Sequence, residues 1–532
     1  MALRQGIFIV PSILILLVVA TSLILVSVES CDDQKPEYQS KWLNHGGDLQ
    51  NRRYAELETK ISPKTAQNLK LNWEFEAKSY TTATPAIYEG TIYFTSFDGN
   101  VYAIKQSDGS LVWKQNLHEI TGFNSTIILF KGTLVLSRAT PTIANDLVIV
   151  TMYGPAVVLG FRRESGEFVW MTRLEDHPDS VITMSGTYYN GGYYVGTSSL
   201  EELASIDKCC TFRGSFAKLE AKTGKIQWQT YMLPDNQGKQ GEYSGAAIWG
   251  SSPSIDVSRN LVYIATGNLY SAPERVEACQ ERENNQTIPT HPEECIEPEN
   301  HENSILALEL ESGDIKWYQQ LGGYDVWFAK CMNLSTPNCP PGPNPDADFG
   351  EAPMLLSVVV NGCRRDVSVA VQKSGIAWGL DRDTGDVIWS TEAGPGGMKG
   401  GGIWGAATDG KRVYTNIANS DAKNFTLKPS NLTTKAGGWV AIDPRGGEIL
   451  WTTANPSNGV SFGPVTVANG VVFAGSYDKQ GNIYAMDAKN GAVLWSYETG
   501  SEVYGGVSVG DGCVYVANGY WTAGKSLFAF CV

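Results

Sequence analysis

The chain has 532 residues, of which 18% are charged, and its formal net charge at neutral pH is −15. This acidity argues against a nucleic-acid partner, because phosphate binding needs clustered lysine and arginine. The 56 glycines and the aromatic fraction of 11% indicate short strands and turns rather than long helices or disorder.

The N-terminal segment predicts export. Arg4 is followed by an uncharged run from Gln5 to Val28, and acidic residues come next. We expect residues 1–30 to be a signal peptide, with Val28 and Ser30 as the small residues of a cleavage site, although the run is also long enough to act as a signal anchor. The remainder is then either secreted or tethered by one membrane span outside the cytoplasm.

One short phrase recurs along the chain and predicts its fold. Each copy is a strand with alternating apolar positions, a glycine turn, and a second strand that carries a tryptophan four residues after the glycine. The seven copies are VYAIKQSDGSLVW, VVLGFRRESGEFVW, FAKLEAKTGKIQW, ILALELESGDIKW, AWGLDRDTGDVIW, WVAIDPRGGEILW and IYAMDAKNGAVLW. A lone hairpin cannot bury its own faces, so the copies must pack on one another.

The spacing of the tryptophans predicts eight blades. Successive tryptophans are between 40 residues (Trp73 to Trp113) and 89 residues (Trp228 to Trp317) apart, and a four-stranded blade needs about 40 to 45. Trp73 has no hairpin strand before it, but the C-terminal residues SLFAFCV supply one. Pairing the two chain ends predicts a closed, all-β, eight-bladed propeller over residues 40–532.

Ten cysteines in an exported chain indicate disulfides. The acidic segment 271–303 lies in the widest tryptophan interval, and we expect it to be a loop inserted between strands of one blade. Cys209 and Cys210 bond each other or other partners. The remaining expected pairs are Cys279–Cys295, Cys331–Cys339 and Cys513–Cys531. Five sequons permit N-glycosylation, at Asn124, Asn285, Asn333, Asn424 and Asn431.

Several common cofactor motifs do not occur in the sequence, among them CxxCH for covalent haem, a Walker loop and a HExxH zinc site. GVSVG, at 506–510, matches a nucleophile elbow but lies in an alternating strand. The run GPGGMKGGGIWG near Gly394 is not followed by a helix, so we expect close backbone packing near the central channel rather than phosphate binding.

The repeated AxDxxxGxxxW phrase resembles the tryptophan-docking motif of the quinoprotein alcohol dehydrogenases. The likeness starts near residue 40, with WLNHGGDLQNRRYA, and is strongest to the polyvinyl-alcohol dehydrogenase branch. It implies a propeller that holds pyrroloquinoline quinone (PQQ) and Ca²⁺ over its central axis. A shared fold does not by itself establish an activity, so the site segments must be compared singly.

The resemblance implies ligands for both groups. Glu201, in VGTSSLEELA, matches a calcium-ligating glutamate, with Glu202 as the adjacent candidate, and Asn268, in LVYIATGNLYS, matches an amide ligand. The implied cofactor-binding residues are Trp249 as the floor beneath the quinone, Lys373 near the quinone oxygens and Arg138 near a cofactor carboxylate. A loop glutamate, a turn asparagine, a core tryptophan or a surface salt bridge are the ordinary alternatives.

One position departs from the family. Where quinoprotein dehydrogenases carry a catalytic aspartate after a tryptophan, GGYDVWFAKC has Phe328, which accepts no proton, and Asp325 is the only nearby carboxylate. Two hypotheses follow. The chain is a PQQ- and Ca²⁺-dependent dehydrogenase of small or polymeric alcohols, with Asp325 as the base and an external electron acceptor. Alternatively, it is an inactive propeller that serves as an extracellular ligand-binding or protein-interaction module.

Overall fold

The computed structural model describes residues 41–127, 135–205, 207–250, 252–285, 295, 297–331, 339–520 and 524–532. The predicted signal segment 1–30 and the sequon at Asn333 lie outside these ranges. Contacts divide the chain into Met1–Tyr38 and Gln39–Val532, and the account below concerns the second unit. Among the described residues, no helix combines the length and the apolar character needed to cross a bilayer.

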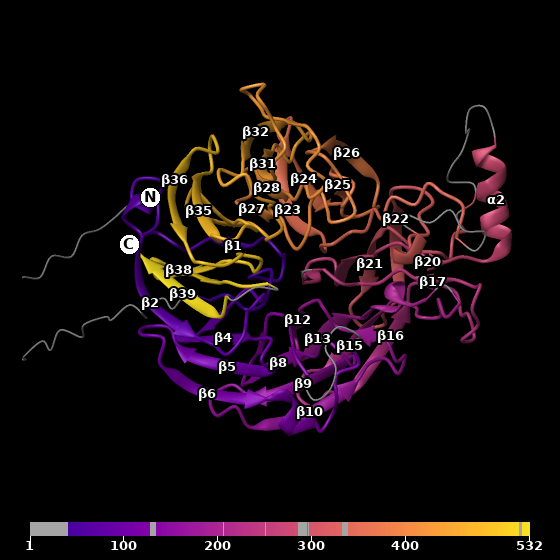
Figure 1. The fold of residues 1–532 in the computed structure, drawn as a ribbon, viewed down its shortest axis with the longest axis horizontal. Coiled ribbons are helices and arrows are strands. Elements are labelled where there is room, and N and C mark those ends of the chain that lie inside the picture. Colours follow the sequence, from indigo (N-terminus) through magenta and orange to yellow (C-terminus); the bar gives the residue numbers. More distant parts are fainter. Residues whose placement is uncertain are drawn as a thin grey trace, which may run out of the picture. The chain divides into compact units, whose positions relative to one another are not determined.

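Eight sheets of the unit Gln39–Val532 follow one another around a central axis (Figure 1). Each blade has four antiparallel strands, given below in order from the innermost to the outermost strand. Blades 1 and 2 are β3 (Ala86–Tyr88), β4 (Thr91–Thr95), β5 (Asn100–Lys105), β6 (Leu111–Asn116), and β7 (Thr142–Ala144), β8 (Leu147–Thr151), β9 (Val157–Arg162), β10 (Phe168–Arg173). Blades 3 and 4 are β12 (Thr187–Tyr189), β13 (Gly192–Gly196), β15 (Ser215–Glu220), β16 (Ile226–Tyr231), and β18 (Ser254–Asp256), β19 (Leu261–Ala265), β21 (Ser304–Glu309), β22 (Ile315–Gln320).

The second half of the chain continues the ring. Blades 5 and 6 are β23 (Met354–Val360), β24 (Cys363–Val371), β25 (Ile376–Asp381), β26 (Val387–Glu392), and β27 (Ala407–Thr408), β28 (Val413–Ile417), β31 (Gly438–Ile442), β32 (Ile449–Ala454). Blades 7 and 8 are β33 (Thr466–Ala468), β34 (Val471–Gly475), β35 (Asn482–Asp487), β36 (Val493–Glu498), and β37 (Ser508–Gly510), β38 (Cys513–Ala517), β39 (Ser526–Cys531), β2 (Lys70–Glu76).

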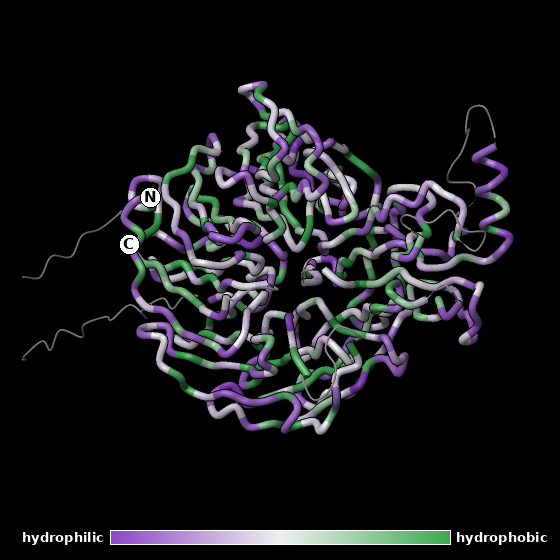
Figure 2. The backbone as a smooth tube through the Cα atoms, in the orientation of Figure 1, coloured by the Kyte–Doolittle hydropathy of each residue, from purple (hydrophilic) through white to green (hydrophobic). Residues whose placement is uncertain are grey.

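Short elements lie in the loops within and between the blades. Three two-stranded ribbons are β11 (Ser180–Val181) with β14 (Ser198–Ser199), β17 (Ser244–Gly245) with β20 (Leu269–Ser271), and β29 (Phe425–Thr426) with β30 (Thr433–Thr434). The helices are α1 (Leu117–Thr121), α2 (Glu274–Asn284) and the 3₁₀ turns η1 (Ala66–Asn68), η2 (Glu201–Leu203) and η3 (Ala329–Cys331). The segment 271–303 lies between β19 and β21 and contains α2, a helix that the sequence analysis did not anticipate and that is largely hydrophilic in Figure 2.

The predicted closure of the ring is confirmed. The N-terminal strand β2 pairs with the C-terminal strand β39 from Lys70 opposite Cys531 to Glu76 opposite Ser526. Both chain ends therefore share one blade, in which β39 is paired on both sides and β2 forms the outer edge. The Cys513–Cys531 disulfide joins β38 to β39 in the same blade, and the pairs Cys279–Cys295, Cys331–Cys339 and Cys209–Cys210 also form.

Each repeated tryptophan is bonded to the next blade rather than to its own. Trp317 in blade 4 donates its indole N–H to the carbonyl of Arg382 in blade 5 at 3.1 Å, and the other seven tryptophans of the repeat make the same contact at 2.8–3.2 Å. The last bond, from Trp495 to Leu69, crosses from the C-terminal to the N-terminal part of the chain.

The turn glycines serve the same contact. All seven adopt φ between 71° and 80°, as a tight turn requires. A Cβ atom on Gly385 would lie 2.5 Å from the ring of Trp317 in the preceding blade, so glycine is required for the approach of the indole as well as for the turn. The phrase is therefore a docking unit in which a tryptophan in one copy contacts a glycine in the next.

An N-terminal arm, residues 42–55, crosses the inner strands of the whole ring. Backbone hydrogen bonds join it to blades 1, 2, 4, 5, 6 and 7, through Trp42, Leu43, Leu49, Gln50, Arg52 and Arg53. Asn44 Nδ2 donates to Thr187 in blade 3 at 2.9 Å. The fully buried Arg53 guanidinium donates to the carbonyl of Val507, before blade 8, at 3.3 Å. These bonds link the arm to all eight blades. The arm ends at β1 (Tyr54–Ala55), which pairs in parallel with β33 of blade 7.

Candidate functional site

The candidate site is built by loops from one end of the blades. Trp249 precedes the first strand of blade 4, and Asp348 precedes the first strand of blade 5. Asn268 and Lys373 follow the second strands of the same two blades. Because antiparallel strands alternate in direction, these two kinds of loop emerge at the same end of the ring, where the four residues make contact.

A lysine and two aspartates form the charged centre of the site. Lys373 Nζ lies 2.7 Å from Asp346 Oδ1 and 2.8 Å from Asp348 Oδ2. Its ammonium is 5.2 Å from the ring centroid of Trp249, and the Trp249 indole N–H donates to Asp348 Oδ2 at 3.2 Å. The backbone N–H of Asn268 donates to the other oxygen of Asp348 at 2.6 Å. The structure thus brings three of the predicted site residues together around Asp348.

The ion pairs keep the lysine charged. Burial alone would lower the pKa of Lys373, but attraction to Asp346 and Asp348 outweighs it and raises this pKa above its usual value. Burial raises the pKa of Glu202 to about 7, with Lys373 opposing that rise and Asp348 adding to it. Three carboxyl groups and one ammonium therefore share this region, where burial raises the pKa of Asp346 as well as that of Glu202.

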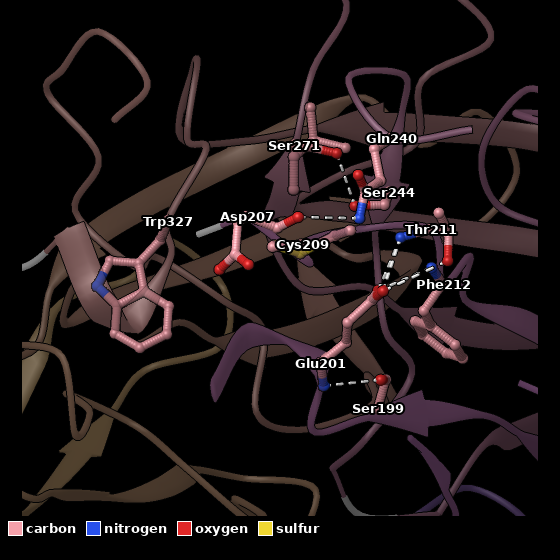
Figure 3. Close-up of a disulfide and its surroundings, with 12 residues drawn as sticks. Ser199, Glu201, Asp207, Cys209, Thr211, Phe212, Gln240, Ser244, Ser271 and Trp327 are labelled. Atoms are coloured by element: carbon pink, nitrogen blue, oxygen red, sulfur yellow. Dashed lines mark hydrogen bonds between the residues drawn. A yellow bond between two sulfur atoms is a disulfide. The ribbon is translucent and has the colours of Figure 1, made fainter. Parts of the chain in front are cut away.

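Glu201 faces the adjacent cysteine pair (Figure 3). Its carboxylate accepts the backbone N–H of Thr211 at 2.8 Å and that of Phe212 at 2.8 Å, directly after Cys209–Cys210. His177 Nε2 lies 3.3 Å from Glu201 Oε1. Burial would raise the pKa of Glu201, but these hydrogen bonds lower it overall. The carboxylate that acts near Lys373 and Asp348 is Glu202, the neighbour named as the second candidate.

Asp325 lies beneath the aspartate pair rather than beside the lysine. It is fully buried and accepts the backbone N–H groups of Asp346 at 3.1 Å and Ala347 at 2.7 Å, and the side chain of Asn303 at 3.1 Å. Burial raises the pKa of Asp325 to about 6, although the N–H of Ala347 opposes the shift. Its observed contacts hold the loop that carries Asp346 and Asp348.

Phe328 is part of an apolar wall. It is buried together with Cys210, Phe212, Ala247 and Tyr270, and Cys209, Trp249 and Cys331 pack against this cluster. The Cys209–Cys210 disulfide and Phe328 thus flank the same indole that the charged centre contacts.

Arg138 lies among aromatic rings on the other side of Trp404. Its guanidinium is 4.5 Å from the ring centroid of Trp404 and 5.8 Å from that of Tyr504. Burial would lower the pKa of Arg138, but Tyr520, Tyr504 and the nearby Tyr153 raise it, so the group stays charged. Arg138, Trp404 and Tyr504 line a small pocket of about 20 Å³, and Trp404 packs edge-on against Trp249 at a centroid distance of 5.1 Å.

The sequence analysis missed Asp346 and Asp348. The sequence feature that could have revealed them is a pair of carboxylates two residues apart. The pair lies between the loop closed by Cys331–Cys339 and the apolar strand β23. The expected role of the glycine-rich run is confirmed, because a Cβ on Gly401 would lie 2.3 Å from the Cα of Gly375, and the Gly401 N–H donates to the carbonyl of Lys373 at 2.8 Å. Close backbone packing thus supports the lysine.

The residues present fit both expected groups. Carboxylate and amide oxygens are the donors that Ca²⁺ prefers, and both kinds of group occur around Lys373. No three histidine, cysteine or carboxylate side chains within the described ranges converge on a metal position by themselves, so Glu202 and Asn268 would supply only part of a calcium shell. Trp249 offers an aromatic floor, and the cations Lys373 and Arg138 suit a planar anionic quinone.

The chain is similar to several known proteins. The PQQ family, described as "Glucose/ethanol/alcohol dehydrogenase, beta-propeller domain", matches residues 42–397, and the BamB outer membrane assembly family matches 436–530. A polyvinylalcohol dehydrogenase from Pseudomonas is 28% identical, over 91% of this chain and 74% of the relative. One from Sphingopyxis is also 28% identical, over 86% and 69%. The solved quinohemoprotein alcohol dehydrogenase ADHIIG from Pseudomonas putida has the same fold, with a TM-score of 0.71 and 18% identity over 92% of this chain and 80% of its own.

Proposed function

Since the chain belongs to the PQQ family of glucose, ethanol and alcohol dehydrogenase propellers, we propose that it oxidises alcohols at the Trp249–Asp348–Lys373 site. The observation that carries this proposal is the contact of one lysine with two aspartates over an indole. These groups supply a base, a cation and a planar floor within one site. The similarity to proteins named polyvinylalcohol dehydrogenases supports secondary alcohols, free or within a polymer, as the proposed substrates of this chain.

Each residue has a defined part in the proposed reaction. When bound, the quinone would supply a two-electron acceptor for the hydride that leaves the alcohol carbon, and the proposed final electron acceptor is external to the chain. Asp348 accepts the hydroxyl proton, so that the product is a carbonyl compound. Lys373 orients Asp348 and stabilises negative charge at the reacting oxygens. Trp249 would support the quinone ring.

Asp348 fits the role of base better than Asp325. The carboxylate of Asp348 contacts Lys373 and Trp249, which belong to the proposed site, whereas the carboxylate of Asp325 accepts hydrogen bonds from the loop at Asp346 and Ala347 and from Asn303. Asp348 can also replace the carboxylate that is missing at position 328, because it supplies a proton acceptor from a segment twenty residues later in the chain. The inactive propeller is therefore the less favoured function.

Calcium is a separate part of the proposal. We propose that Glu202 and Asn268 ligate the ion. Glu202 interacts electrostatically with Lys373 and Asp348, and Asn268 is hydrogen-bonded to Asp348. Glu201, the first sequence candidate, would then support the ion indirectly by holding the disulfide loop. The same proposal includes export and N-glycosylation, and four of the five sequon asparagines are exposed.

The test is dye-linked alcohol oxidation by the purified, exported chain after incubation with PQQ and Ca²⁺. Absorbance of the bound quinone is measured first, and oxidation of a panel of primary and secondary alcohols second. The proposal expects saturable quinone binding and turnover that depends on both additions. Saturable binding with no turnover of any alcohol would support the inactive module instead.

A further inference from the structure

Six aromatic side chains gather at the end of the propeller that carries the site. Tyr80, Phe462 and Tyr504 precede the first strands of blades 1, 7 and 8, as Trp249 does in blade 4. The other three follow second strands, as Lys373 does in blade 5. We call these six residues the aromatic arc: Phe462, Tyr477, Tyr504, Tyr520, Tyr80 and Phe97.

The arc is continuous. Tyr504 and Tyr520 stack with ring centroids 4.2 Å apart and planes inclined by 12°. On one side, Tyr477 lies 6.1 Å from Tyr520 and 4.9 Å from Phe462. On the other, Tyr80 lies 6.4 Å from Tyr520 and 4.5 Å from Phe97. The rings thus form one surface that extends across three blades.

The arc starts at the proposed reaction centre. The indole N–H of Trp404 donates to the Tyr504 hydroxyl at 2.7 Å, and Trp404 packs against Trp249. A ligand that lies along the arc can therefore place one end close to Trp249. Of the six members, Tyr80, Tyr477, Tyr504 and Tyr520 are partly exposed, whereas Phe97 and Phe462 are buried beneath them.

The two sides of this end differ in charge. Blades 3 to 5 contribute Glu202, Asp346, Asp348 and Lys373. The partly exposed members of the arc are all phenols, and the cation beside them, Arg138, is half-buried against the rings of Tyr504 and Tyr520. A phenol ring presents an apolar face to methylene groups and a hydroxyl to polar groups. A neutral chain that carries both kinds of group matches this surface, and it buries no charge on binding.

We propose that the aromatic arc binds a linear polyol, a chain in which methylene and hydroxymethine groups alternate. The inference rests on the proposed function, because one hydroxymethine of the chain must reach Asp348. A small alcohol needs only the base and the quinone, so it leaves most of the arc uncovered. The arc thus determines a preference for long substrates.

The first experiment measures binding without turnover. Polyvinyl alcohol of defined length is titrated into the quinone-free protein by calorimetry. Replacement of Tyr80 or Tyr477 by alanine is expected to weaken binding roughly tenfold, and Tyr477→Phe to retain most of it. Tyr231→Ala, at an exposed tyrosine on the outer strand β16, is the matched control and leaves binding unchanged. Thermal unfolding verifies that each variant folds.

The second experiment compares substrates in the quinone-loaded protein. Tyr477→Ala is expected to lower kcat/KM for polyvinyl alcohol roughly tenfold more than kcat/KM for propan-2-ol. Equal losses for both substrates, or weaker quinone binding, would overturn the inference, as would tighter binding of a glucan than of the polyol. If no alcohol is oxidised but the polymer still binds through the arc, the proposed function fails and the binding site stands.

Discussion

Lys373 Nζ lies 2.8 Å from Asp348 Oδ2, and both groups contact the same indole ring, that of Trp249. The two residues lie at the two ends of one hairpin of blade 5, Asp348 before β23 and Lys373 after β24. The pairing of these strands brings them together, and the pair is the part of the site on which the proposed chemistry depends most directly.

Replacing Asp348 by asparagine is expected to abolish most turnover. The amide keeps the shape of the side chain but is a very weak base, and a positioned general base contributes about 10² to 10⁴ in rate. The measurement is kcat for propan-2-ol, together with quinone absorbance to verify loading. Asp325→Asn is the comparison, and a larger loss of kcat in that variant would return the role of base to Asp325.

Removing the charge of Lys373 is expected to destabilise the protein. Lys373→Met leaves Asp346 and Asp348 buried without a counter-charge, and breaking a buried ion pair costs about 3 to 5 kcal/mol. Urea unfolding measures the loss. A second change, Asp346→Asn, should recover part of it by removing one carboxylate, and additive losses in the double variant would contradict the pairing.

The docking contact can be separated from the strain of the turn. Gly385→Ala places a Cβ 2.5 Å from the ring of Trp317, at φ 80°. Gly410 has nearly the same φ, 78°, with no atom within 4 Å of an added Cβ. Both variants carry the strain of positive φ, about 1 to 2 kcal/mol, but only Gly385→Ala should lose a further 1 to 3 kcal/mol, approximately, from overpacking. Equal unfolding midpoints would argue against the docking contact.

The buried carboxyl group of Glu351 should make the stability of the folded protein depend on pH. Glu351 is buried near Arg53, and burial raises its pKa from 4.5 to about 8. The folded state thus keeps its proton while the unfolded state loses it, so the contribution of Glu351 is full below about pH 4.5 and is lost as the pH rises to about 8. Glu351→Gln should flatten the fall of the unfolding midpoint over this range. An unchanged pH profile would assign the effect to other groups.

The docking repeat was readable from the chain because it is local. A strand, a glycine turn and a tryptophan occupy thirteen or fourteen consecutive residues, and seven such copies with an eighth split between the ends admit few closed arrangements. The disulfide pairs followed from short separations within the predicted blades. The partner of each indole was not readable in the same way, since Trp317 contacts Arg382 and Gly385 of the next blade.

The site was predicted only in part for the same reason. The segments that contain Trp249, Asn268 and Lys373 resemble a known family pattern. Asp346 and Asp348 instead come after the loop closed by Cys331–Cys339, where the comparison with the family pattern predicted no site residue. Sequence distance could not show that Glu201 turns toward Thr211 and Phe212 while Glu202 acts near Lys373. Adjacent side chains of one 3₁₀ turn point in different directions, and only packing decides which direction faces the axis.

The amino-acid sequence by itself determined the number of blades and the closure of the ring, because these depend on a repeated short-range pattern of apolar residues, glycine and tryptophan. The tertiary structure decided which carboxylates meet the lysine, how the arm of residues 42–55 crosses the ring and where the aromatic rings gather. Some of these contacts join distant parts of the chain, as Arg53 and Val507 do, and others close a hairpin of one blade, as Lys373 and Asp348 do. Neither kind is encoded in a short-range pattern of residues, because side-chain packing decides it.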